Sequence, residues 1–134
     1  MKAVDTNVLV RFLVRDDENQ AHTVYNAFIK AEIDKQSFFV PLLVVLETVW
    51  VLDSVYKLSR KEILDAFYDL LLLPILKFED ASTIHRFIAM ARKNKIDLPD
   101  ALIACSAILS GCDRVLTFDK KASTFDFFEL LETT

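Results

Sequence analysis

The chain has 134 residues, of which 53% are hydrophobic and 27% are charged. This composition is typical of a globular protein and excludes a chain that is disordered throughout. The 20 acidic residues outnumber the 16 basic ones and give a net charge of −4, which argues against nucleic-acid binding by a broad basic surface. Because one glycine and three prolines leave few candidate linkers, we expect residues 1–134 to form a single domain.

Short β-like runs alternate with longer helical runs, a pattern that favours an α/β fold with βα units around a parallel sheet. In chain order we expect a strand at 1–4, helices at 6–14 and 17–33, a strand at 37–40, helices at 41–56 and from 59 to Pro74, a strand at 75–78, helices at 81–93 and 98–110, and strands at 114–118 and 127–131.

Local chemistry supports several of these helix ends. Ser59 and Glu62 have the spacing of a capping box, in which each side chain binds the other residue's backbone N–H. Pro41 suits a first helical turn, where its missing N–H would be unpaired anyway. Gly111 is placed to terminate the helix that precedes it.

No signal peptide is visible, and the strongest apolar run, at 38–52, contains Pro41 and Glu47. It is also shorter than the roughly 20 apolar residues that a membrane span needs. The two cysteines, Cys105 and Cys112, form no C-x-x-C pair and suit free thiols in a reducing compartment. We therefore expect a cytoplasmic protein with no membrane attachment.

Two aspartates directly follow expected strands. Asp5 lies between the first strand and the first helix, and Asp119 ends the strand at 114–118. In a parallel α/β sheet this is the carboxyl edge, where such folds bind their ligands. Each also has an ordinary structural interpretation, Asp5 as a helix N-cap and Asp119 as a turn residue. Taken singly, neither aspartate decides between a site and a cap.

Glu47 is unusual because its helical neighbours are all apolar: Leu43, Val44, Trp50 and Val51. No local cation partners this acid, and a buried carboxylate without a partner is costly. Glu47 therefore needs an ion, a distant cation or a proton, unless the helix is exposed at this one point.

Asp97 and Asp100 lie at the start of the helix at 98–110. Acids in a first turn are stabilised by the exposed N–H groups and the helix dipole. Asp97 can serve as the cap, which leaves Asp100 available to another ligand. Asp5, Glu47, Asp100 and Asp119 then form a constellation whose mutual repulsion calls for positive charge. Mg²⁺ or Mn²⁺ supplies it naturally, because hard divalent ions prefer oxygen ligands.

The segments around these acids resemble the landmarks of the PIN-domain family. The resemblance rests on Asp5-Thr6-Asn7, on Glu47 in its apolar helix, on Asp100-Ala101-Leu102-Ile103-Ala104 and on Thr117-Phe118-Asp119. These segments follow the family's order and usual separations across nearly the whole chain. The size of the chain is similar to that of VapC-type toxins, the ribonuclease components of toxin–antitoxin pairs.

The resemblance implies a three-layer fold with a central, mainly parallel five-stranded sheet flanked by helices. It also implies a Mg²⁺- or Mn²⁺-dependent endoribonuclease that forms a homodimer and is held inactive by a cognate antitoxin. Asp5 and Asp100 would be core metal ligands, Glu47 would complete the site, and Asp119 would bind a second metal or position water. Asn7 and Thr117 match positions that orient these acids. Asp97 also matches a frequently acidic position, although capping explains it equally well.

On this hypothesis, metal-activated water cleaves an RNA phosphodiester without a covalent nucleophile. Two alternatives remain. A haloacid-dehalogenase-like phosphatase would open with an Asp-x-Asp motif, whereas Asn7 occupies the third position here. A catalytically silent PIN-like binding module would gain nothing from clustered carboxylates. His22 and His85 lie in expected helices far from the landmarks and are interpreted as surface or packing residues.

The basic residues that could contact RNA are few for a nucleic-acid enzyme. Arg11 and Arg15 lie one helical turn apart, and Arg92, Lys93 and Lys95 follow one another closely. A solvated surface is the ordinary interpretation of all five, so the RNA path stays open at this point.

Overall fold

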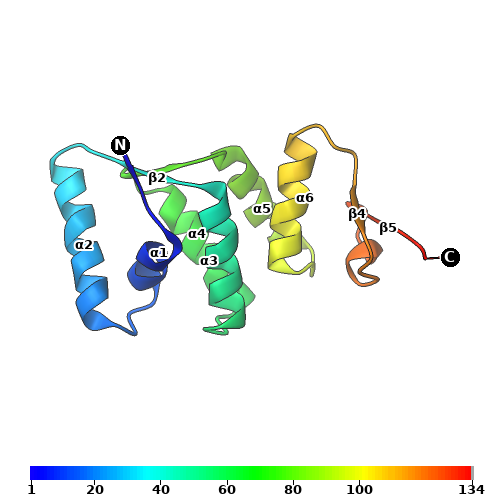
Figure 1. The fold of residues 1–134 in the computed structure, drawn as a ribbon, viewed down its shortest axis with the longest axis horizontal. Helices are drawn as coiled ribbons and strands as arrows, with labels where there is room; N and C mark the ends of the chain where they lie inside the picture. The colour runs from blue at the N-terminus through cyan, green and yellow to red at the C-terminus, as the bar shows by residue number, and fades with distance from the viewer. Residues whose placement is uncertain (134) are drawn as a thin grey trace. The chain divides into compact units, whose positions relative to one another are not determined.

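A computed structural model describes residues 1–133 of the chain and divides it into two compact units. The first unit is Met1–Ala81, coloured blue to green in Figure 1, and the second begins at Ser82. Both combine helices with parallel strands, which confirms the α/β class. In the described part of the chain, no helix combines the length and the apolar character that a bilayer span requires.

The first unit builds a three-stranded parallel sheet with helices between its strands. The sheet order is β1-β2-β3, and Phe38 pairs with Lys2 on one side and with Leu76 on the other. The elements are β1 (Lys2–Ala3), α1 (Thr6–Leu13), α2 (Glu18–Ile33), β2 (Phe38–Val40), α3 (Leu42–Ser54), α4 (Arg60–Leu71) and β3 (Leu76–Phe78).

Helix packing buries the core of the first unit. Helix α1 contacts both α2 and α3, and α3 contacts α4. The side chains at the centre of this packing are almost completely buried: Leu9, Val10, Val45, Val49, Leu52, Ile63, Phe67 and Leu70. On α4, the buried residues Ile63, Phe67 and Leu70 recur at helical spacing, so one apolar face of an amphipathic helix accounts for its position.

The second unit contains two helices and a pair of parallel strands. Its elements are α5 (Ala81–Lys93), whose first residue belongs to the first unit, α6 (Leu98–Leu109), β4 (Val115–Thr117), a 3₁₀ turn η1 (Ala122–Thr124) and β5 (Phe128–Leu130). Val115 pairs with Phe128 and Thr117 with Leu130. The core of this unit includes Ile84, Phe87, Ile96, Leu102 and Phe128.

The local signals in the sequence are confirmed at the helix ends. Ser59 and Glu62 form the complete capping box of α4. Gly111 has a φ of 94° just beyond α6, in the left-handed region that residues with a Cβ rarely adopt. Its N–H donates to the carbonyl of Ile108. Pro41 is the N-cap of α3 rather than part of its first turn.

The expected elements are present, but the five strands are divided between two sheets. Three belong to the sheet of the first unit and two to the sheet of the second, and all the described pairings are parallel. The strands are only two or three residues long, so each sheet is small. Turn η1, between β4 and β5, was not expected from the sequence.

Candidate metal centre

Asp5 both ends the first strand segment and caps the first helix. The N–H of Val4 donates to the carbonyl of Phe39 on β2 at 2.9 Å, which fixes the backbone beside Asp5. The Oδ1 atom of Asp5 accepts a hydrogen bond from the backbone N–H of Asn7 at 2.8 Å. The capping interpretation is therefore confirmed, and Asn7 orients Asp5 through its backbone amide. The Asp5 side chain is exposed, so the cap leaves it accessible.

Of the interpretations offered for Glu47, the one in which the helix is exposed at this point is confirmed. Glu47 is exposed on α3, and its neighbours Leu43 and Trp50 are themselves 79% and 52% exposed. The buried side of α3 carries Val45, Val49 and Leu52 instead. Glu47 thus lies on an exposed, largely apolar strip of the helix, and burial imposes no need for a proton or an ion.

Three acids of the second unit, Asp97, Asp100 and Asp119, lie close enough to influence one another. Partial burial of Asp100 raises the pKa of its carboxyl above the ordinary value, and the charges of Asp97 and Asp119 raise it further. Lys121 acts in the opposite direction and lowers the pKa of Asp100. The second unit therefore concentrates negative charge at the start of α6, as the sequence predicted.

Asp97 occupies the N-cap position of α6 but makes no side-chain capping bond. Its Oδ1 atom instead lies 3.6 Å from Nζ of Lys121. Capping by the Asp97 carboxylate, one of the two interpretations offered by the sequence, is therefore wrong. Asp100 lies in the first turn of the same helix.

Asp119 follows β4 and organises the turn after it. Its Oδ1 atom accepts hydrogen bonds from the N–H groups of Lys121 at 2.8 Å and Ala122 at 3.1 Å. The backbone N–H of Asp119 donates to Oγ1 of Thr117 at 3.0 Å. Thr117 thus helps to hold the backbone of Asp119 in place.

These carboxylates have the donor chemistry that Mg²⁺ and Mn²⁺ prefer, but the part of the chain that the structure describes gathers no ligand set within either unit. Within each unit, taken over the described residues, no three His, Cys, Asp and Glu side chains come close enough together to hold a metal ion. Lys121 is the residue that the sequence analysis missed. Its position two residues after Asp119 was the available signal.

Comparison with known protein families shows which family the chain belongs to. A sequence model of the PIN domain matches residues 2–127, which includes elements of both units. The chain belongs to the PIN domain family. This confirms the resemblance inferred from the four acidic segments.

A curated relative of this PIN domain is the VapC ribonuclease of Aquifex aeolicus. The two sequences are 27% identical over 127 residues, which cover 95% of this chain and 93% of the relative. The similarity therefore extends along almost the whole of both proteins.

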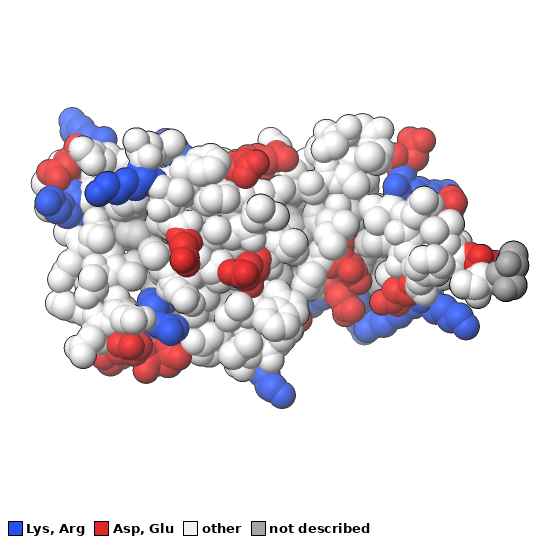
Figure 2. All heavy atoms as spheres, viewed as in Figure 1, with Lys and Arg blue, Asp and Glu red and all other residues white. Residues whose placement is uncertain are grey.

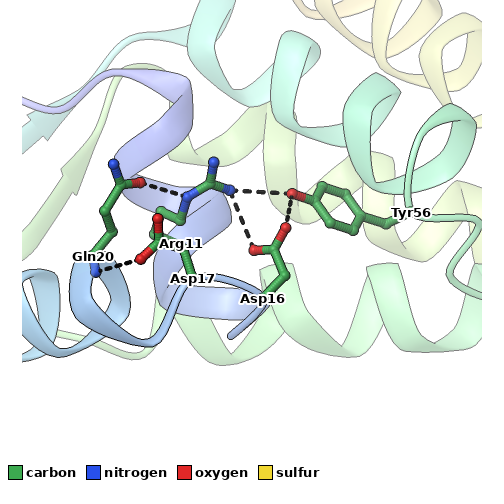
Figure 3. A network of polar contacts seen from close by, with 5 residues as sticks. All are labelled: Arg11, Asp16, Asp17, Gln20 and Tyr56. Carbon is green, nitrogen blue, oxygen red and sulfur yellow. Dashed lines mark hydrogen bonds and ion pairs between the residues drawn. The ribbon is translucent and has the colours of Figure 1, made fainter.

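Among the basic residues considered for RNA contact, Arg11 is held within the PIN domain by a polar network (Figure 3). Its Nε donates to Oε1 of Gln20 at 2.7 Å, and its Nη1 donates to the hydroxyl of Tyr56 at 3.1 Å. Nη1 also lies 3.4 Å from a carboxylate oxygen of Asp16. These contacts and a side-chain exposure of only 22% favour a structural role for Arg11.

The other charged residues do not supply an obvious RNA path. Arg15 lies 3.5 Å from Glu18, while Lys93 and Lys95 are exposed. On the face drawn in Figure 2, Lys and Arg side chains of the described residues are scattered among Asp and Glu rather than joined in one broad basic field. His22 and His85 are both exposed on helices, as expected for surface residues.

Proposed function

We propose that this PIN domain is a Mg²⁺- or Mn²⁺-dependent endoribonuclease. The observation that carries the proposal is the proximity of Asp97 and Asp119 to Asp100 in the second unit, where their charges raise the pKa of the Asp100 carboxyl. Negative charges held near one another are stabilised when a cation is added between them. Membership of the PIN domain family and similarity to a relative named a ribonuclease support RNA as the substrate.

In this proposal Asp5, Glu47, Asp100 and Asp119 would hold the metal, and Asp97 would support them. The caps made by Asp5 and Asp119 engage Oδ1 of each carboxylate and fix the orientation in which these acids would meet the metal. Asp5 and Glu47 come from the first unit, and their participation is supported by the family match across both units.

When bound, the metal would activate water for attack on a phosphodiester and offset the charge that develops at phosphorus. The chain's own contribution is to hold the acids in place. The cap from the Asn7 amide orients Asp5, and the turn after β4 together with the Thr117 hydroxyl orients Asp119. Carboxylates that are already held in place need little reorganisation during the reaction. This preorganisation increases the reaction rate.

The direct test is cleavage of single-stranded RNA by purified protein with Mn²⁺. We expect Asp5→Asn and Asp100→Asn to abolish cleavage, because each removes a proposed ligand from a different unit. Asp53→Asn and Asp126→Asn are matched controls at exposed acids of the first and second units, and both should stay active. Undiminished cleavage by Asp5→Asn and Asp100→Asn would contradict the assignment.

Metal binding can be measured separately from cleavage. Any ligand that binds only the folded state raises the melting temperature Tm. We expect Mn²⁺ to raise the Tm of the wild-type protein and to raise that of Asp100→Asn much less. If Mn²⁺ leaves the wild-type Tm unchanged, the chain is a silent binding module instead.

We further propose that the chain is the toxin of a toxin–antitoxin pair, cytoplasmic, homodimeric and inhibited by a cognate antitoxin. The support is its similarity along almost its whole length to a VapC ribonuclease. Induced expression should arrest bacterial growth, and co-expression of a short neighbouring reading frame should restore it. Growth arrest that persists in Asp100→Asn would separate toxicity from RNA cleavage and contradict this role.

A further inference from the structure

Lys121 contacts or faces all three acids of the second unit. Its backbone N–H donates to Oδ1 of Asp119 at 2.8 Å, and its Nζ lies 3.6 Å from Oδ1 of Asp97. Its charge also acts on Asp100, opposing the effect of Asp97 and Asp119 on that carboxyl. One lysine therefore supplies positive charge at the place where negative charge is concentrated.

The position of Lys121 is set by the backbone of the turn. Asp119 accepts from the N–H groups of both Lys121 and Ala122, and Lys121 is the residue before η1. This arrangement holds the Cα of Lys121 next to Asp119, and from there the side chain extends to Asp97 at the start of α6. The ammonium group thus bridges two separate segments of the second unit.

Stability alone does not explain this ion pair. The side chains of Lys121 and Asp97 are 71% and 58% exposed, and exposed ion pairs contribute little to folding. Charge, however, acts over several ångströms in solvent of low ionic strength. A lysine here affects whatever cation approaches these acids, even though it adds little to the fold.

We propose that Lys121 is a built-in counter-cation that competes with the divalent metal for the acids of the second unit. This inference rests on the metal site proposed above. Lys121 is a positioning residue: it holds Asp97 and offsets the acids when metal is absent, and its charge opposes the arriving ion. Its presence weakens metal affinity.

Loss of an ordinary supporting residue would weaken metal binding. Loss of the Lys121 charge should instead strengthen it. Removing the charge makes the potential around the acids more negative, so Lys121→Gln should bind Mn²⁺ more tightly. For a unit charge several ångströms from a divalent ion, we expect a decrease in Kd of roughly three- to tenfold at low ionic strength, with a smaller decrease in high salt. Lys121→Arg keeps the charge and should bind Mn²⁺ as the wild type does.

Titration calorimetry with MnCl₂ alone, in buffer of low ionic strength, measures this without any RNA. Lys120→Gln is the matched control, because it removes the same charge from the adjacent exposed residue while the Asp97 contact belongs to Lys121. Its Kd should change less than twofold. Equal or weaker Mn²⁺ binding by Lys121→Gln overturns the inference, and so does equal tightening by Lys120→Gln.

The same titrations separate this inference from the proposed function. If the wild type binds Mn²⁺ and Lys121→Gln binds it no more tightly, the competition is wrong while the metal site stands. If neither the wild type nor any Lys121 variant binds Mn²⁺, the metal site and the competition are both wrong. If Lys121→Gln binds Mn²⁺ more tightly than the wild type and loses this gain when Asp100→Asn is added, that result supports both the metal site and the competition by Lys121.

Discussion

The hydroxyl of Tyr56 accepts a hydrogen bond from the guanidinium of Arg11 at 3.1 Å and donates one to Asp16 at 2.8 Å. Arg11 lies on α1, Asp16 on the connection to α2, and Tyr56 just beyond α3. Figure 3 shows the three side chains meeting, with Gln20 bound to the other side of the guanidinium. The network therefore ties together three segments of the first unit at one point.

Removing the Tyr56 hydroxyl should loosen this junction. Tyr56→Phe keeps the ring but leaves Arg11 and Asp16 without their shared partner, and we expect Tm to fall by roughly 2–5 °C. Thermal unfolding followed by circular dichroism measures the change. Tyr25→Phe is the control, since Tyr25 is 48% exposed on α2 and should shift Tm by less than about 1 °C. Equal effects of the two variants would show that the network adds no stability.

The capping box at the start of α4 is a second local test. The Ser59 hydroxyl accepts from the Glu62 N–H at 3.1 Å, and the Glu62 carboxylate accepts from the Ser59 N–H at 3.2 Å. Ser59→Ala leaves the Glu62 N–H without this acceptor and should destabilise the protein by about 1 kcal/mol. Urea unfolding measures the loss, and Ser54→Ala, at the last residue of α3, provides a comparison. A loss for Ser59→Ala no larger than for Ser54→Ala would contradict the cap's contribution.

The elements predicted correctly are those decided by neighbouring residues. Ser59 and Glu62 fix the start of α4, and Gly111 fixes the end of α6, because capping and a positive φ depend only on the adjacent backbone. Asp97 marked the right position, but its carboxylate pairs with Lys121. Whether Asp97 pairs with Lys121 depends on where the turn after β4 lies in space. The spacing of residues around Asp97 does not reveal this.

The exposure of Glu47 could not be predicted from local sequence either. Helix α3 is apolar on most of its surface, so periodicity does not distinguish the side that faces the core from the side that faces solvent. Val49 is completely buried while Trp50, its neighbour, is 52% exposed. The segment was correctly placed as a helix, whereas the sequence did not decide whether Glu47 was buried or exposed.

The two thiols should differ sharply in reactivity. Cys105 is buried beside Met90, with 3.7 Å between the sulfur atoms, whereas Cys112 is exposed. Burial raises the pKa of the Cys105 thiol above its ordinary value, although Arg86 lowers it in part. Because the thiolate is the reactive form, Cys105 should react slowly at pH 8 and Cys112 quickly.

A colorimetric thiol reagent added to native protein at pH 8 measures this difference. One thiol should react rapidly, and Cys112→Ser should abolish that fast phase. The raised pKa also means that Cys105 favours the folded state while it is protonated, and that this contribution is lost as pH rises through the raised pKa. Rapid modification of Cys105 in folded Cys112→Ser would contradict its burial.

Glu47 provides the test that best separates function from folding. Because Glu47 is exposed on α3, Glu47→Gln removes a charge without opening a cavity or leaving a buried group unpaired, and Tm should change by less than about 1 °C. As a proposed metal ligand it should nevertheless be needed for catalysis, and we expect RNA cleavage with Mn²⁺ to fall at least tenfold, about the loss that a weakened metal site produces. Asp53→Asn, an exposed acid on the same helix, should leave cleavage unchanged. Full activity of Glu47→Gln would remove this residue from the site, while equal losses in both variants would point to a general effect of charge on α3.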